Sequence, residues 1–158
     1  MIFVTVGTQK FQFNRLIQTV DSLIDEGKIS DDVFAQIGNS DYIPRNLQYA
    51  RFLSTNEYNM YLDKCNIIIS HSGVATIVKG IKAGKKVIVV PRLKIYGEHV
   101  DDHQRQIADA FEKLDFIVQC VDLKELDEKL EWVKEHKFAI YKSQRLKVVE
   151  TIENFLSE

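Results

Sequence analysis

One segment of the sequence, residues 66–92, limits the fold of this chain more than any other. It contains two short apolar runs, 67–69 and 87–90, joined by a polar turn at 70–73 and by apolar residues at helical spacing that end at Gly84. Two strands joined by a helix-length connection are parallel, with a right-handed crossover. Neither run alternates with polar residues, so both strands are expected to be covered on both faces.

The polar turn of this unit is a candidate anion-binding site. Ser72 and Gly73 lie where the first strand ends and the helix presents free N–H groups, and the helix dipole favours an anion there. Gly73 leaves room for a phosphate beside the backbone, while Ser72 and Thr76 can donate or accept hydrogen bonds. In the alternative interpretation, Ser72 only caps the helix and Gly73 only turns the chain.

The remaining sequence repeats the alternation of strand and helix. Strands are predicted at 1–6, 33–37, 47–53 and 116–121, and helices at 13–24, 54–63 with Thr55 as N-cap, 103–114, 123–134 and 141–156. This order predicts an α/β fold, with an open, mainly parallel, Rossmann-like sheet and helices on both faces. A length of 158 residues without a linker or repeat predicts one domain, 1–158. The last helix either packs on its own sheet or docks a partner.

Composition excludes several classes of function. A formal net charge of −2 gives no electrostatic case for nucleic acid. Two cysteines, Cys65 and Cys120, are too few for a disulfide scaffold or a zinc site, and both are expected to be buried as small apolar groups. No apolar run approaches the ~18 residues of a membrane span, and the first residues lack the basic region of a signal peptide. We therefore expect a cytoplasmic protein.

Gly7 and Thr8 form a second polar turn. They follow the first predicted strand and precede the first helix. Gly7 allows a ligand or another backbone to come close, and Thr8 offers a polar side chain. The turn is either a second ligand corner or a simple strand-to-helix connection.

Residues 92–104 hold the densest cluster of polar and ionisable side chains in the sequence. Asp101 or Asp102 is the natural N-cap of the helix that follows. His103 and Gln104 then fall in its first turn and are expected to point toward the sheet edge that carries the 70–73 turn. The alternative is a solvated loop with a capped helix.

Several chemistries lack their usual signatures. The sequence has no Walker loop, no full dinucleotide glycine fingerprint and no nucleophile elbow, because 70–73 lacks the first glycine in register. His71, His99 and His103 lack a metal-ligand spacing on one helix face, so no metal is predicted. The remaining candidate is a site in which backbone amides bind a phosphorylated ligand and short polar side chains hydrogen-bond to its hydroxyl groups. A sugar nucleotide fits this description.

At these residues the sequence resembles a known family. The Ser72-Gly73 turn with Thr76, the break at 83–84, Pro91 and the 102–104 triplet are similar to the C-terminal, donor-binding half of GT-B glycosyltransferases of the MurG type, family 28. Segments 3–8 and 97–104 also resemble the PssE-type exopolysaccharide subunit. They are similar as well to the soluble subunit of the eukaryotic two-subunit transferase that adds the second GlcNAc to lipid-linked GlcNAc. The match covers nearly the whole chain.

The resemblance implies a donor half that works with a partner. A separate membrane-anchored subunit would bind the lipid-linked saccharide acceptor and carry the catalytic base, and the donor half would reach the inner face of the membrane through it. The donor is a UDP-sugar, a substrate rather than a cofactor. The resemblance leaves a homodimer of the isolated chain open.

The resemblance also implies roles for individual residues. The donor diphosphate and nucleotide are assigned to Gly7, Thr8, Ser72, Gly73 and Thr76, and the donor sugar to Glu98, Asp102, His103 and Gln104.

One position departs from the MurG pattern. There an acidic residue on the helix after the Ser-Gly turn holds the ribose hydroxyls, and this chain has Lys79 at that position. A lysine cannot accept those hydrogen bonds, so another residue such as Glu98 takes the role, the ribose is held less tightly, or the nucleotide is read differently.

We therefore expect the donor-binding catalytic subunit of an inverting hexosyltransferase in capsule or exopolysaccharide synthesis. Two alternatives stay open: a non-catalytic subunit that stabilises such a transferase, and a stand-alone enzyme, such as an epimerase, that acts on a nucleotide sugar. The sequence does not identify the sugar, the acceptor or the oligomeric state.

Overall fold

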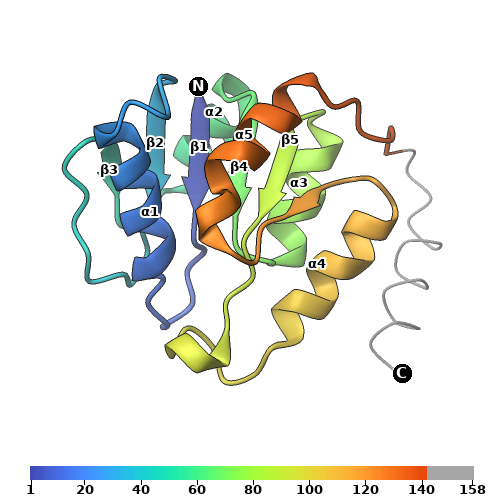
Figure 1. Cartoon of the computed structure of the whole chain (residues 1–158). Coiled ribbons are helices and arrows are strands. Elements are labelled where there is room, and N and C mark those ends of the chain that lie inside the picture. The colour runs from blue at the N-terminus through green and yellow to red at the C-terminus, as the bar shows by residue number, and fades with distance from the viewer. Residues whose placement is uncertain (142–158) are drawn as a thin grey trace.

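Six parallel strands form the sheet in the computed structural model, which describes residues 1–141. Their order across the sheet is β3-β2-β1-β4-β5-β6 (Figure 1). The strands are β1 (Ile2–Thr5), β2 (Val33–Gln36), β3 (Gln48–Ala50), β4 (Ile67–Ser70), β5 (Lys86–Val89) and β6 (Val118–Gln119). The predicted Rossmann-like parallel sheet is confirmed.

Helices cover both faces of this sheet (Figure 1). They are α1 (Asn14–Asp25), α2 (Thr55–Lys64), α3 (Val74–Lys82), α4 (His103–Lys113) and α5 (Leu126–Glu135), with short 3₁₀ turns η1 (Lys94–Tyr96) and η2 (Leu123–Glu125). No helix within residues 1–141 is both long enough and apolar enough to cross a bilayer. The helix predicted at 141–156 lies almost wholly outside the described residues.

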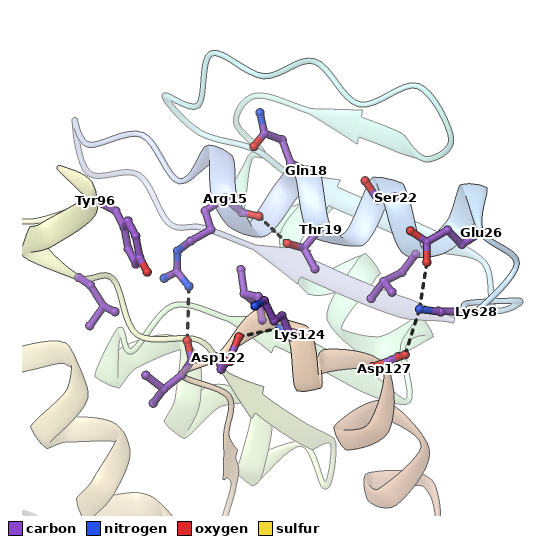
Figure 2. A pocket seen from close by; sticks show the side chains of 14 residues that line it. Arg15, Gln18, Thr19, Ser22, Glu26, Lys28, Tyr96, Asp122, Lys124 and Asp127 are labelled. Carbon is purple, nitrogen blue, oxygen red and sulfur yellow. Dashed lines mark hydrogen bonds and ion pairs between the residues drawn. The ribbon is translucent and has the colours of Figure 1, made fainter.

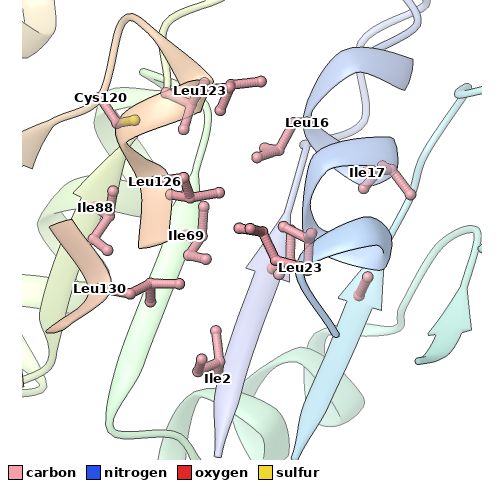
Figure 3. Packing of buried hydrophobic residues seen from close by; sticks show 14 of the residues in the cluster. Ile2, Leu16, Ile17, Leu23, Ile69, Ile88, Cys120, Leu123, Leu126 and Leu130 are labelled. Carbon is pink, nitrogen blue, oxygen red and sulfur yellow. The ribbon is translucent and has the colours of Figure 1, made fainter. Parts of the chain in front are cut away.

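Alternate strand residues build two hydrophobic layers. Ile67 and Ile69 of β4 belong to the cluster under α1 and α5, whereas Ile68 belongs to the cluster under α2, α3 and α4. Figure 3 shows the first layer, in which Leu16 and Leu23 of α1 and Leu126 and Leu130 of α5 lie over the strands. Because the central strands are covered on both sides, they need the uninterrupted apolar runs seen in the sequence.

The strand order reverses between β1 and β4. The chain leaves β1 to build β2 and β3 on one side, and leaves β4 to build β5 and β6 on the other. The loops after β1 and β4 therefore diverge at their carboxyl ends, and an open α/β sheet binds ligands in the crevice at this point. This crevice is where the sequence places the turns 7–8 and 70–73.

Local capping differs from the sequence prediction in two places. The N-cap of α2 is Ser54 instead of Thr55, because the Ser54 hydroxyl accepts from the Glu57 amide and the Glu57 carboxylate accepts from the Ser54 amide. The N-cap of α3 is Gly73, so Ser72 does not cap the helix. At α4 the N-cap position is Asp102, while the Asp101 carboxylate accepts from the His103 amide.

The capping box of α2 gives a stability prediction. Ser54→Ala removes the hydroxyl and should lower the free energy of unfolding by about 1 kcal/mol, measured by urea denaturation with an unchanged m-value. Thr55→Ala is the matched control, since the Thr55 hydroxyl has no capping role. It should leave the free energy of unfolding within about 0.3 kcal/mol of the wild-type value. Equal losses in the two variants would contradict the assignment.

Candidate functional site

A pocket of about 430 Å³ opens at the carboxyl ends of β1 and β4. Its lining combines the two turns with residues of α2 and α3: Thr5, Gly7, Thr8, Gln9, Gln36, Leu53, Thr55, Tyr58, His71, Gly73, Val74, Ala75, Thr76 and Lys79. The pocket therefore brings together four of the five residues predicted to bind the donor diphosphate and nucleotide, Gly7, Thr8, Gly73 and Thr76. Their ligand role itself stays a prediction.

His71 also lines this pocket, although neither the sequence pattern nor the family resemblance gave it a role there. The side chain is buried, and its Nδ1 has no hydrogen-bond partner among residues 1–141. Burial, and then the positive charge of Arg92, lower the imidazole pKa from its usual range to about 4. His71 is therefore neutral near pH 7, with one ring nitrogen able to accept and the other able to donate.

Two glycines make room for the His71 ring. A Cβ atom at Gly7 would lie 2.6 Å from Cε1 of the ring, and one at Gly73 would lie 2.9 Å from the same atom. Gly7 also has a left-handed backbone, with φ of 76°. The ring thus lies between the two turns, which explains why both carry a glycine.

The charge of the pocket favours an anion. Its lining, as far as residues 1–141 form it, includes the ammonium group of Lys79 and no carboxylate. Lys79 lies over the ring of Tyr58, with Nζ 5.1 Å from the ring centroid. The first turn of α3 adds free backbone N–H groups, since Gly73 provides no capping side chain.

Ser72 lies behind the pocket instead of lining it. The residue is 1% exposed, and its hydroxyl has no hydrogen-bond partner within the described part of the chain. A buried hydroxyl without a partner is unfavourable, so a bound group or a small rotation of the turn would satisfy it.

The four residues predicted to contact the donor sugar do not line this pocket. Glu98 is fully buried, and its carboxylate accepts from the Arg15 guanidinium at 2.9 Å and from the Leu93 amide. Gln104 is 6% exposed and its side-chain oxygen accepts from the Arg92 amide. In the described structure, both side chains hold the loop after β5 in place.

Asp102 and His103 are more accessible than Glu98 and Gln104. The Asp102 carboxylate accepts from the Lys94 amide at 2.9 Å. The His103 side chain is 65% exposed and lies beside the Gln106 amide oxygen. Sugar contacts by these four residues therefore remain a prediction.

A larger groove of about 840 Å³ lies between α1 and the start of α5 (Figure 2). Several of its charged side chains already have partners. Lys28 pairs with Glu26 and Asp127, and Arg15 pairs with Glu98. The pocket beside His71 is the better candidate site, because it combines unpaired polar atoms with a free helix end. No three His, Cys, Asp or Glu side chains within residues 1–141 form a metal-ligand set.

A parallel sheet of this order, with a pocket where the order reverses, defines a Rossmann-like domain. Its fold matches the MurG crystal structure from Acinetobacter baumannii (TM-score 0.58, 18% identity), covering 99% of this chain and 45% of that one. It also matches the solution structure of ALG13 (TM-score 0.60, 20% identity), covering 96% and 94%. At these identities the likeness establishes the fold.

Sequence comparison identifies the family. The model of the glycosyltransferase family 28 C-terminal domain matches residues 1–154, so the chain belongs to that family. The UDP-N-acetylglucosamine transferase subunit ALG13 of Candida albicans is 29% identical over 126 residues, which cover 73% of this chain and 40% of the relative. The chain thus spans less than half the length of that relative. The predicted resemblance to this family is confirmed.

The buried imidazole gives a pH prediction. The pKa of His71 is lowered to about 4 in the folded state, whereas an unfolded chain keeps the ordinary histidine pKa of 6.5. As the pH falls below 6.5, the unfolded chain therefore binds the proton first. His71 should therefore destabilise the folded state by roughly 1 kcal/mol per pH unit between these two values. The measurement is urea unfolding of wild type and His71→Gln at several pH values. The difference between the two free energies should change across this window, and parallel curves would contradict the assignment.

Proposed function

We propose that this chain is the donor-binding subunit of a UDP-sugar-dependent, inverting glycosyltransferase, which transfers a hexosyl group such as galactose or GlcNAc to a lipid-linked saccharide. The observation that carries the proposal is the pocket at the β1–β4 crossover. There the N-terminus of α3, Lys79 and the neutral His71 converge, and residues 1–141 place no carboxylate in the lining. A diphosphate is the ligand that best matches this combination of donors and charge.

The proposed chemistry is one displacement at the anomeric carbon. The acceptor hydroxyl attacks this carbon, the bond to the diphosphate oxygen breaks, and UDP leaves with the electron pair. Groups that stabilise the negative charge growing on the diphosphate lower the barrier. Lys79 and the α3 amides supply that stabilisation, while a neutral His71 can donate a hydrogen bond without carrying charge.

A partner subunit belongs to this proposal. The match covers 45% of MurG, so more than half of that transferase lies outside it. The Candida relative is itself named a transferase subunit. We propose that a membrane-anchored partner binds the lipid-linked acceptor and provides the base that takes the hydroxyl proton. The setting in capsule or exopolysaccharide synthesis is part of the same proposal.

Nucleotide binding is the direct test. Calorimetry with UDP, UDP-galactose, UDP-GlcNAc and UDP-glucose should give saturable binding of at least one of them. The titrations are run with the chain alone and with a co-expressed membrane-anchored partner. Absence of binding in every titration would refute the proposal. Sugar transfer that survives His103→Ala unchanged would argue against a sugar contact there and for the alternative, a non-catalytic stabilising subunit.

Lys79 provides a more specific test of diphosphate binding. Lys79→Ala should weaken UDP binding about tenfold, a loss of about 1.4 kcal/mol, and should reduce its dependence on salt. Uridine, which lacks the diphosphate, should bind equally to both proteins. Lys82→Ala is the matched control, because Lys82 lies on the same helix but does not line the pocket. A stronger effect at Lys82, or an equal loss of uridine affinity, would show that Lys79 does not face the phosphates.

A further inference from the structure

Arg92 has the largest fully buried side chain in the described part of the molecule, and no ligand-binding assignment above explains it. It follows β5 by three residues, and its side chain crosses the carboxyl edge of the sheet toward β1. The ring of Phe13 packs against the guanidinium, with 4.9 Å between the guanidinium carbon and the ring centroid. Its backbone amide is held by the Gln104 side chain.

The guanidinium binds backbone carbonyls of the loop after β1. Its Nη2 donates to the Val6 carbonyl at 2.6 Å, and its Nη1 donates to the carbonyls of Phe11 and Gln12 at 3.0 and 2.9 Å. The same Nη1 also reaches the Glu98 carbonyl at 3.3 Å. Arg92 therefore holds both ends of the 7–12 loop together with the segment after β5.

Burial of this charge is unfavourable. It lowers the pKa of Arg92 to about 10, and the nearby charge of Glu98 opposes that shift only in part. The Arg92 Nε atom has no partner among residues 1–141. An apolar side chain of similar volume would fill the same space without this penalty. The role of the arginine therefore lies in the backbone that its donors hold, and this backbone includes the loop that faces the pocket.

We propose that Arg92 is a positioning residue for the diphosphate: by fixing the carbonyls of Val6, Phe11 and Gln12, it sets the distance between the Gly7 turn and the Gly73 turn. This inference rests on the proposed function. Gly7 directly follows Val6, and the His71 ring lies between the two glycines. Movement of the Val6 carbonyl would therefore change the space beside the ring, where the phosphates bind.

The charge of Arg92 also favours an anion in the pocket. Besides burial, Arg92 and, to a smaller extent, His99 favour the uncharged form of His71 and lower its pKa. Arg92 does not line the pocket, whereas Lys79 does. The pocket thus presents positive charge from behind the Gly7 turn and from α3, with a neutral imidazole between them.

The test compares two ligands in Arg92→Lys, which keeps the charge but cannot reach all four carbonyls. The affinity for UDP should fall by about 10- to 100-fold, as expected when charge-assisted hydrogen bonds are lost, while the affinity for uridine stays within about twofold. A purely structural role would weaken both ligands equally, and that result would overturn the proposal. Arg45→Lys, on the exposed loop after β2, is the control and should change neither affinity.

A milder variant covers the case in which Arg92→Lys does not fold. Phe13→Leu loosens the packing under the guanidinium and should lower the affinity for UDP about threefold, with the affinity for uridine unchanged.

If wild type itself binds no uridine nucleotide, the proposed function fails. The positioning role is then tested by amide hydrogen exchange, since residues 7–12 should exchange faster in Phe13→Leu than in wild type. Equal exchange rates of residues 7–12 in the two proteins would overturn the positioning role of Arg92.

Discussion

The carboxyl edge of this sheet depends on one buried cation, the guanidinium of Arg92. Loops beyond parallel strands have no ladder partners of their own, so their backbone groups must find hydrogen bonds elsewhere. Arg92 donates to carbonyls of the loop after β1 and to the Glu98 carbonyl of the loop after β5, and the Glu98 carboxylate accepts from Arg15 and Leu93. An ordered edge follows, and an ordered edge is what a ligand pocket on loops requires.

The pocket beside this network shows how position sets the chemistry of a histidine. His71 follows a central strand directly, so it is buried where a neighbouring cation already lies. Both conditions favour the neutral ring. The positive charge at the pocket comes instead from Lys79 and from the dipole of α3. The same corner therefore combines a lysine, free helix N–H groups and an uncharged imidazole.

The architecture was predictable because it follows from local patterns. Apolar runs such as 67–69 required strands covered on both faces, and the helical spacing between runs required parallel crossovers. Capping was less predictable, because Ser54 and Thr55 are both suitable caps and only the reciprocal bond to Glu57 selects Ser54. Similarly, Ser72 resembles a cap in the sequence, but the α3 N-cap is Gly73 and Ser72 is buried behind the turn.

By itself the sequence determined the parallel α/β sheet, the sheet edge at which the candidate pocket opens, and membership of the glycosyltransferase family 28 C-terminal domain. Tertiary structure decided which polar side chains line the pocket there. Glu98 and Gln104, which the family resemblance assigns to the donor sugar, hydrogen-bond to Arg15 and to the Arg92 amide and do not line the pocket. The physical reason is distance along the chain. Arg92 binds a carbonyl 86 positions away, and no local pattern encodes a contact of that separation.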